Sequence, residues 1–156
     1  MNKQKLNLLI LEDNPHDVEL MVRVLKKAGF VLEWKRVDTE KAFKKALTEK
    51  PDIILAGNKL PSFYGLAAIK LQQKIAPEIP LILVSGTIGE ECAVECLKAG
   101  ATDYVLKDKL FRLSPVVKRA LKEAEEYRKR KKMKKHYEKV KRNTMCFLKL
   151  LKLLPI

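Results

Sequence analysis

The fold is decided by the stretch Pro51-Asp52-Ile53-Ile54-Leu55-Ala56-Gly57-Asn58-Lys59-Leu60-Pro61-Ser62-Phe63-Tyr64-Gly65. Its apolar part, Ile53 to Ala56, is short, rich in β-forming residues and bounded by Pro51 and by a turn. This pattern predicts a strand buried on both faces of a parallel sheet. Ligands of open α/β sheets bind just beyond the carboxyl ends of such strands, so the residues from Gly57 onward mark an expected site.

Strand and helix patterns alternate along the rest of the chain. Further strands are predicted at residues 6–11, 31–37, 80–85 and 102–106, with 31–37 at the sheet edge because its apolar residues only alternate. Asn14-Pro15 opens the first helix, Thr39 or Asp38 caps the second, and Ser114-Pro115 is expected to start the last. Five strands alternating with five helices predict a parallel sheet with right-handed crossovers.

Composition favours a globular α/β protein of one domain plus an appendage, since the chain has 156 residues and is 47% hydrophobic. The apolar run Leu6–Leu11 is too short for a signal peptide or a membrane span, so a cytoplasmic location is expected. Cys92 and Cys96 lie four residues apart, but no nearby His or Cys completes a tetrahedral metal set. We therefore expect both to be core residues.

The net charge of +14 is unevenly distributed. Residues 118–156 contain 15 Lys/Arg and 4 Asp/Glu, whereas residues 1–117 contain 18 and 15. We expect two parts, a globular domain over residues 1–125 and a basic helical tail over residues 126–156.

Four predicted strand ends carry polar or unusual residues: Glu12-Asp13, Gly57, Ser85 and Lys107. Adjacent carboxylates suit a hard cation such as Mg²⁺, and a hydroxyl with an ammonium suits a phosphoryl group. The first turn lacks Gly-x-Gly-x-x-Gly, and the stretch from Ser85 to Gly89 lacks the Gly-Lys-Ser/Thr ending of a phosphate loop. Both nucleotide-binding classes are therefore disfavoured.

Taken in order, these residues resemble those of response-regulator receiver domains. Glu12-Asp13, Leu60-Pro61, Ser85, Tyr104 and Lys107 match the family's acidic pocket, loop, hydroxyl, switch aromatic and lysine. The resemblance covers about residues 5–125. Within the family, the sequence is similar to chemotaxis regulators and to receivers that precede sensory or histidine-kinase modules. It implies a flavodoxin-like, doubly wound, five-stranded parallel sheet of order 2-1-3-4-5, with an extended C-terminal helix.

Two positions depart from the family pattern. Asp108 stands where many receivers have proline, which affects the loop more than the chemistry. The family's aspartate, which takes a phosphoryl group from a histidine kinase, is replaced by Gly57. Whether Gly57 is natural divergence or a recent or engineered loss stays open.

The resemblance also implies roles for the residues that remain. Glu12, Asp13 and the backbone carbonyl of Lys59 would hold Mg²⁺, with affinity lowered by the missing carboxylate. Lys107 is expected to pair with Glu12 or Asp13. Ser85 is no replacement acceptor, because no general base is evident beside it.

Ser85 and Tyr104 form the family's switch pair. Without a phosphoryl group, we expect Tyr104 to pack on the last helix. The expected function is two-component (phosphorelay) signal transduction by a non-enzymatic pseudo-receiver, which docks onto a histidine kinase or another signalling protein.

The tail has its own pattern, in which the basic run 128–132 is followed by a 4-3 apolar register typical of a short coiled coil or docking helix. Its members are Met133, Tyr137, Val140, Thr144, Phe147, Leu151 and Leu154. A solvated helix, self-association, and binding to nucleic acid or an anionic membrane all remain open, as does a truncated signalling linker. The alternative function is therefore an adaptor that works through this tail. No DNA-reading module follows the receiver, so transcriptional output is not supported.

Overall fold

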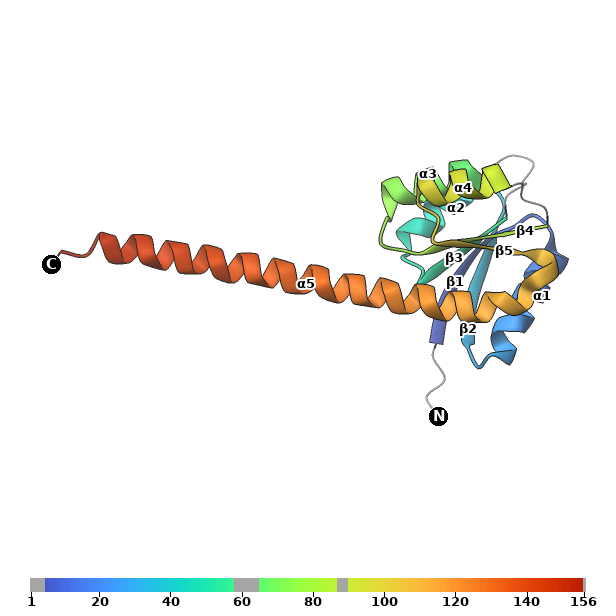
Figure 1. Cartoon of the computed structure of the whole chain (residues 1–156), viewed down its shortest axis with the longest axis horizontal. Coiled ribbons are helices and arrows are strands. Elements are labelled where there is room, and N and C mark those ends of the chain that lie inside the picture. Colours follow the sequence, from blue (N-terminus) through green and yellow to red (C-terminus); the bar gives the residue numbers. More distant parts are fainter. Residues whose placement is uncertain (1–4, 58–64, 87–89, 156) are drawn as a thin grey trace. The chain divides into compact units, whose positions relative to one another are not determined.

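The predicted alternation of strands and helices is present in the structure, a computed structural model that describes residues 5–57, 65–86 and 90–155 (Figure 1). The elements in chain order are β1 (Lys5–Leu11), α1 (Pro15–Lys27), β2 (Val31–Val37), α2 (Glu40–Thr48), β3 (Ile53–Ala56), α3 (Gly65–Ile75), β4 (Leu81–Ser85), α4 (Glu90–Ala99), β5 (Asp103–Leu106), the 3₁₀ helix η1 (Lys107–Arg112) and α5 (Leu113–Lys152).

The five strands form one parallel sheet in the order β2-β1-β3-β4-β5. This confirms the flavodoxin-like arrangement. Every residue of β3 and β4 is buried, because helices cover both faces of the sheet. The edge strand β2 is buried only at its last residue, Val37, as its alternating pattern predicted.

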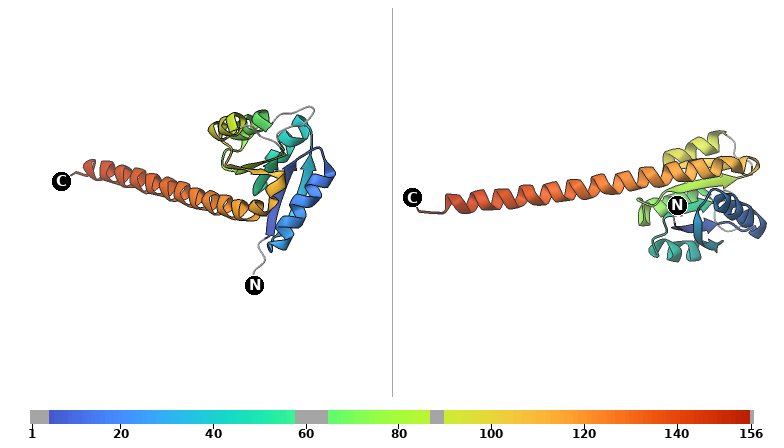
Figure 2. Two further views of the ribbon diagram at one scale, coloured as in Figure 1. Left: turned by 45° about the vertical axis from the view of Figure 1, so that its right-hand side comes forward. Right: turned by 90° about the horizontal axis from the view of Figure 1, so that it is seen from below.

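Two hydrophobic clusters lie on opposite faces of the sheet. The helices that cover these faces are seen in Figure 2. Helices α2, α3 and α4 pack on one face, where Phe43, Ile69 and Cys96 are buried. Helix α1 and the first turns of α5 pack on the other, where Met21, Leu25 and Val117 are buried. Adjacent strand residues supply alternate faces, which is why β3 feeds both clusters.

The caps of the first two helices are as predicted. Asn14 accepts a hydrogen bond from the N–H of His16 at 3.0 Å, and Thr39 rather than Asp38 accepts one from the N–H of Ala42 at 3.2 Å. Gly29 follows α1 with φ of +98°, a conformation that favours glycine.

The start of the last helix differs from the prediction. Helix α5 begins at Leu113, directly after η1, so Ser114 lies inside its first turn and does not cap it. The Ser-Pro signal was misleading because the chain is already wound as a 3₁₀ helix before it reaches Ser114.

The chain divides into two compact units, residues 1–122 and 123–156. In the second unit every residue from 125 to 155 is exposed. Within the part of the chain that is described, no helix has the length and apolar character needed to cross a membrane.

Candidate functional site

The sheet register brings the predicted residues to one edge of the sheet. Leu11 pairs with Ala56, Ala56 with Leu83, and Ser85 with Leu106. Because all the strands are parallel, the residues that follow these strand ends gather at the same edge. The structure therefore places Glu12, Gly57, Ser85 and Lys107 on one side of the domain.

Gly57 is buried, and its N–H donates a hydrogen bond to the carbonyl of Leu11 at 2.8 Å. A Cβ atom at position 57 would lie 2.7 Å from Oε2 of Glu12, which is closer than real Cβ contacts allow. The Glu12 side chain therefore occupies the space into which any side chain at position 57 would extend.

The Glu12 carboxylate is held from several directions, and the residue is only 2% exposed. Its Oε1 atom accepts hydrogen bonds from the backbone N–H groups of Asp13 at 3.1 Å and Asn14 at 3.2 Å. Its backbone carbonyl accepts a hydrogen bond from Nη1 of Arg36 at 3.2 Å. These contacts orient the carboxylate inward, toward Gly57.

Lys107 lies between two carboxylates. Its Nζ atom is 3.1 Å from Oε2 of Glu12 and 2.6 Å from Oδ2 of Asp17. Oε2 of Glu12 is buried, and Lys107 is the cation beside it. The prediction of a Glu12 partner is confirmed, but the second partner is Asp17 rather than Asp13, which is exposed.

The pKa shifts follow from this arrangement. Burial raises the pKa of Glu12, and the side-chain hydrogen bond with Asp13 raises it further, against the opposing effects of Asn14 and Lys107. The same hydrogen bond lowers the pKa of Asp13. Burial lowers the pKa of Lys107, but Asp17 and Glu12 outweigh burial, so the net shift is upward and Lys107 stays charged.

Asp17 and Arg36 contact residues of the candidate site, and sequence reasoning missed both. An acidic residue in the first turn of a helix is ordinarily explained by the helix dipole, and Asp17 occupies that position in α1. Asp17 could have been predicted as a partner of Lys107 from its position five residues after Glu12, because Lys107 follows a strand that ends at the same edge of the sheet. Arg36 belongs to an exposed strand and carried no signal.

Ser85 and Tyr104 lie on neighbouring strands. Ser85 is buried at the end of β4. Tyr104 is half-buried and packs against the cluster beneath α2, α3 and α4. The expectation that it packs on the last helix is wrong, because the strand alternation turns its side chain to the opposite face from α5. Lys59 and Leu60-Pro61 lie outside the described residues.

The acidic residues, as they lie, do not fit a metal ion. Both oxygens of Glu12 are already engaged, and among the described side chains no group of three His, Cys, Asp or Glu residues gathers to hold a metal. Asp13 is the carboxylate of the pair that faces solvent. A hard cation needs several oxygen ligands, so this geometry would have to rearrange before binding one.

Cys92 and Cys96 serve in packing. Cys96 is buried, and burial together with its neighbour Cys92 raises the pKa of its thiol to about 11. A thiol with this pKa is protonated at neutral pH, as is usual for a cysteine buried in apolar surroundings.

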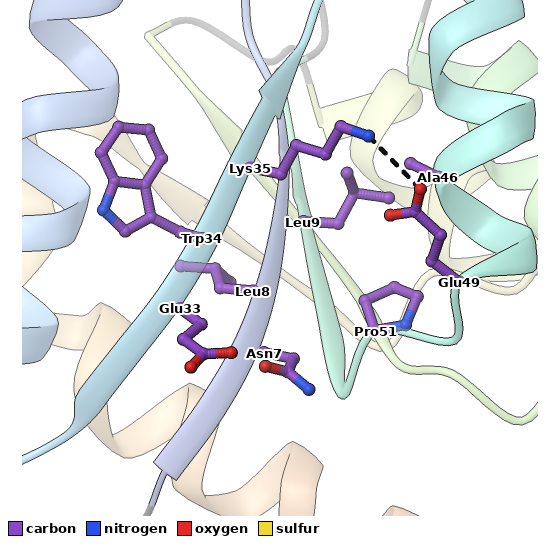
Figure 3. A pocket seen from close by; sticks show the side chains of 9 residues that line it. All are labelled: Asn7, Leu8, Leu9, Glu33, Trp34, Lys35, Ala46, Glu49 and Pro51. Atoms are coloured by element: carbon purple, nitrogen blue, oxygen red, sulfur yellow. Dashed lines mark hydrogen bonds and ion pairs between the residues drawn. The ribbon is translucent and has the colours of Figure 1, made fainter.

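A separate open pocket of about 280 Å³ lies between β1, β2 and the C-terminal end of α2 (Figure 3). Its rim carries an ion pair between Nζ of Lys35 and Oε1 of Glu49, 3.5 Å apart, beside Pro51. Leu9 and Ala46 contribute its apolar part. The pocket contains none of the residues at the carboxyl ends of the strands.

Known proteins with similar sequences identify this architecture. The pattern of the response regulator receiver domain matches residues 8–118, and the chain belongs to this family. The chain is 30% identical over 100 residues to the chemotaxis protein CheY of Thermotoga maritima, covering 64% of this chain and 83% of that protein. It is 28% identical to the transcriptional regulatory protein ZraR of Salmonella typhimurium, covering 78% of this chain but only 27% of that longer protein.

Solved structures show the same fold. NtrX from Brucella abortus superposes with a TM-score of 0.74 at 25% identity, over 85% of this chain and 31% of that chain. The receiver domain of NarL from Mycobacterium tuberculosis superposes with a TM-score of 0.67 at 20% identity, over 76% and 98%. Receiver domains are in general non-enzymatic modules that interact with histidine kinases and bind Mg²⁺ at an acidic pocket.

Proposed function

We propose that this chain is a pseudo-receiver, a two-component signalling module that acts by docking onto a histidine kinase or another signalling protein without being phosphorylated at position 57. The observation that carries this proposal is the contact between Glu12 and Gly57. Position 57 has no attacking oxygen, and the carboxylate of Glu12 occupies the space where a side chain would stand.

The charges at this edge support the proposal. The Lys107 ammonium already has Glu12 and Asp17 within 3.1 Å. An incoming phosphoryl group would have to displace a carboxylate from Lys107 and would bring more negative charge to a place that Asp13 also borders. We infer that the pocket rests in one state, with Lys107 fixed by the protein's own carboxylates.

In this proposal the other candidate residues keep their positions but lose most of their part in metal binding and phosphate switching. Glu12, Asp13 and the Lys59 carbonyl would bind Mg²⁺ only weakly, because Glu12 faces inward. Ser85, Tyr104 and Lys107 keep the positions of a phosphate switch without a phosphate to report. The docking part would be residues 1–125, with residues 126–156 as a linker, in a cytoplasmic protein that catalyses no reaction.

The test is treatment of the full chain with acetyl phosphate and Mg²⁺, followed by intact-mass measurement. We expect no adduct, and a stoichiometric gain of roughly 80 Da, the mass of a phosphoryl group, would overturn the proposal.

Two matched variants sharpen the test. Gly57→Asp supplies a nucleophile and Gly57→Asn supplies the same bulk without one. Because either side chain must first displace Glu12, we expect Gly57→Asp alone to be phosphorylated slowly, and Gly57→Asp combined with the shorter Glu12→Asp to react faster. Gly57→Asn stays unmodified. An adduct on Gly57→Asn would place the modification elsewhere.

A second candidate function is an adaptor that binds an anionic partner through the basic tail. It is favoured by the composition of residues 128–152, which contain twelve Lys/Arg and one acidic residue, Glu138, all exposed. Deletion of residues 128–156 separates the two functions. The adaptor loses binding to anionic vesicles or DNA, whereas kinase docking through the first unit is retained.

A further inference from the structure

We propose that residues 128–154 dock on a membrane surface bearing anionic lipid headgroups, lying in the interface as an amphipathic helix. The inference rests on the second candidate function and chooses among its partners. It does not depend on the chemistry at Gly57, so the two can fail separately.

The helix carries a continuous apolar stripe. Residues three and four apart share one face of a helix, and the 4-3 register keeps to that face from Met133 to Leu154, about two thirds of the second unit. The stripe is uncovered, since Met133 is 73% exposed, Tyr137 67% and Phe147 61%. An apolar face of this length is expected to have a partner.

The rest of the helix surface is strongly basic over residues 128–142, whereas over residues 143–154 Lys149 and Lys152 alternate with further apolar residues. Lys134, Lys141 and Lys152 each directly follow a stripe residue and therefore flank the stripe, whereas Lys149 lies roughly 160° around the helix from Leu151. Lysine side chains can lay their methylene stems along an apolar surface and keep the ammonium at headgroup level. An anionic membrane surface would bury the apolar stripe and at the same time place negative headgroups beside the lysines.

A second copy of the chain would cover the stripe but would leave the lysines beside it without acidic partners. In a coiled coil the positions beside the apolar seam face one another. Here they are Lys134, His136, Lys141, Asn143, Leu148 and Leu150, none of them acidic. Glu138 lies roughly 140° around the helix from Leu151, at 100° per residue, and cannot reach the seam. Pairing two such helices would bring their like charges together.

Nucleic acid would pair its phosphates with the lysines but would leave the apolar stripe uncovered. Phosphate neutralisation explains twelve cations but leaves Phe147, Leu148 and Leu151 in water. Interfacial rather than spanning insertion follows from the lysines within the helix, in line with the finding that no described helix is apolar enough to span a bilayer.

The experiment is vesicle co-sedimentation of the full chain, with phosphatidylcholine vesicles and with vesicles in which about a third of the lipid is phosphatidylserine. We expect binding to the anionic vesicles that is at least about tenfold tighter than to the neutral ones and that weakens in high salt. Equal binding to both compositions, or binding to neither, would overturn the proposal.

Matched variants test the role of the stripe. Phe147→Ser and Leu151→Ser remove apolar groups from it, and we expect each to weaken vesicle binding several-fold. Met145→Ser is the control, since Met145 is 53% exposed and lies roughly 120° around the helix from Leu151. Circular dichroism shows whether all three variants keep the helix. If the control weakens binding as much as the stripe variants, the stripe is not the docking face.

Two further measurements identify the other partners. Tight binding to a DNA duplex that is unaffected by Leu151→Ser, without vesicle binding, would assign the tail to nucleic acid. Self-association by sedimentation equilibrium that Leu151→Ser abolishes, again without vesicle binding, would assign it to a second copy. Reaction with acetyl phosphate should be unchanged in every tail variant, so failure of this inference leaves the pseudo-receiver proposal standing.

Discussion

The basic side chains of the two units differ in how many carboxylates lie near them. In the first unit, Lys107 has two carboxylates within 3.1 Å, and its side chain is only 29% exposed. In the second unit, the twelve cations between residues 128 and 152 have one acidic residue among them, Glu138. Three more glutamates lie just before them, of which Glu125 pairs with Lys129 at 3.2 Å. Cations and carboxylates are balanced at the sheet edge, whereas the tail carries a large excess of positive charge.

The apolar residues differ in the same way. Phe43 is completely buried on the inner face of α2, whereas Phe147 is 61% exposed on α5. Burial of an aromatic side chain stabilises the folded state, but an exposed one contributes almost nothing until it is covered. The two units should therefore respond very differently to the same substitution.

The largest expected effect is on these two phenylalanines. Phe43→Ala should lower the free energy of unfolding by about 3–5 kcal/mol, because it leaves a cavity in a fully packed cluster. Phe147→Ala should change it by less than about 0.5 kcal/mol. Urea denaturation monitored by circular dichroism measures both, and similar losses would mean that the tail stripe is covered within the free protein.

The next largest effect on the free energy of unfolding is expected for Lys107 compared with Lys129. Lys107→Met should cost about 2–3 kcal/mol, since it leaves Glu12 buried without its cation, whereas Lys129→Met removes an exposed pair and should cost less than about 0.5 kcal/mol. Methionine keeps the length of the aliphatic chain in both cases. Equal costs would contradict the structural role of Lys107.

A smaller effect on the free energy of unfolding is expected for Gly57 compared with Gly86. Gly57→Ala should cost about 1–2 kcal/mol because its Cβ displaces the Glu12 carboxylate, whereas Gly86→Ala meets no atom within 4 Å and should be neutral or slightly stabilising. In a Glu12→Ala background the cost of Gly57→Ala should fall by about 1 kcal/mol. Strict additivity in this double-mutant cycle would show that Glu12 does not fill the space.

The smallest effect concerns helicity of the tail. Like charges four residues apart, such as Arg128 with Lys132 and Lys131 with Lys135, oppose the helix, so raising the salt concentration should deepen the 222 nm ellipticity slightly. Lys131→Glu turns one repulsion into an attraction and should flatten this dependence. A tail that loses helicity in salt would disagree with the charge pattern.

Much of the fold was predictable because its signals are local. The run Ile53–Ala56, the Asn14-Pro15 start and the alternation of Val31–Val37 each follow from neighbouring residues, and the strand order followed from family resemblance. The start of α5 was not predictable in the same way, because η1 lacks a distinctive sequence signal.

The site was only partly predictable, because side-chain direction depends on packing between distant elements. Strand ends identified Glu12, Gly57 and Lys107, and Glu12 was among the expected partners of Lys107. Asp17 became a partner only because α1 lies beside the end of β5. The inward turn of Glu12 could not be inferred either, since it depends on backbone N–H groups in the turn and on space at Gly57.

The contact between Lys107 and Asp17 joins residues 90 positions apart. Closing so long a loop is slow, and it requires strands from both halves of the chain to be in place first. This ion pair should therefore form after the folding transition state, so that Lys107→Met accelerates unfolding while leaving the refolding rate nearly unchanged. The lysine would then act as a latch that determines how long the assembled domain survives, rather than how quickly it is made.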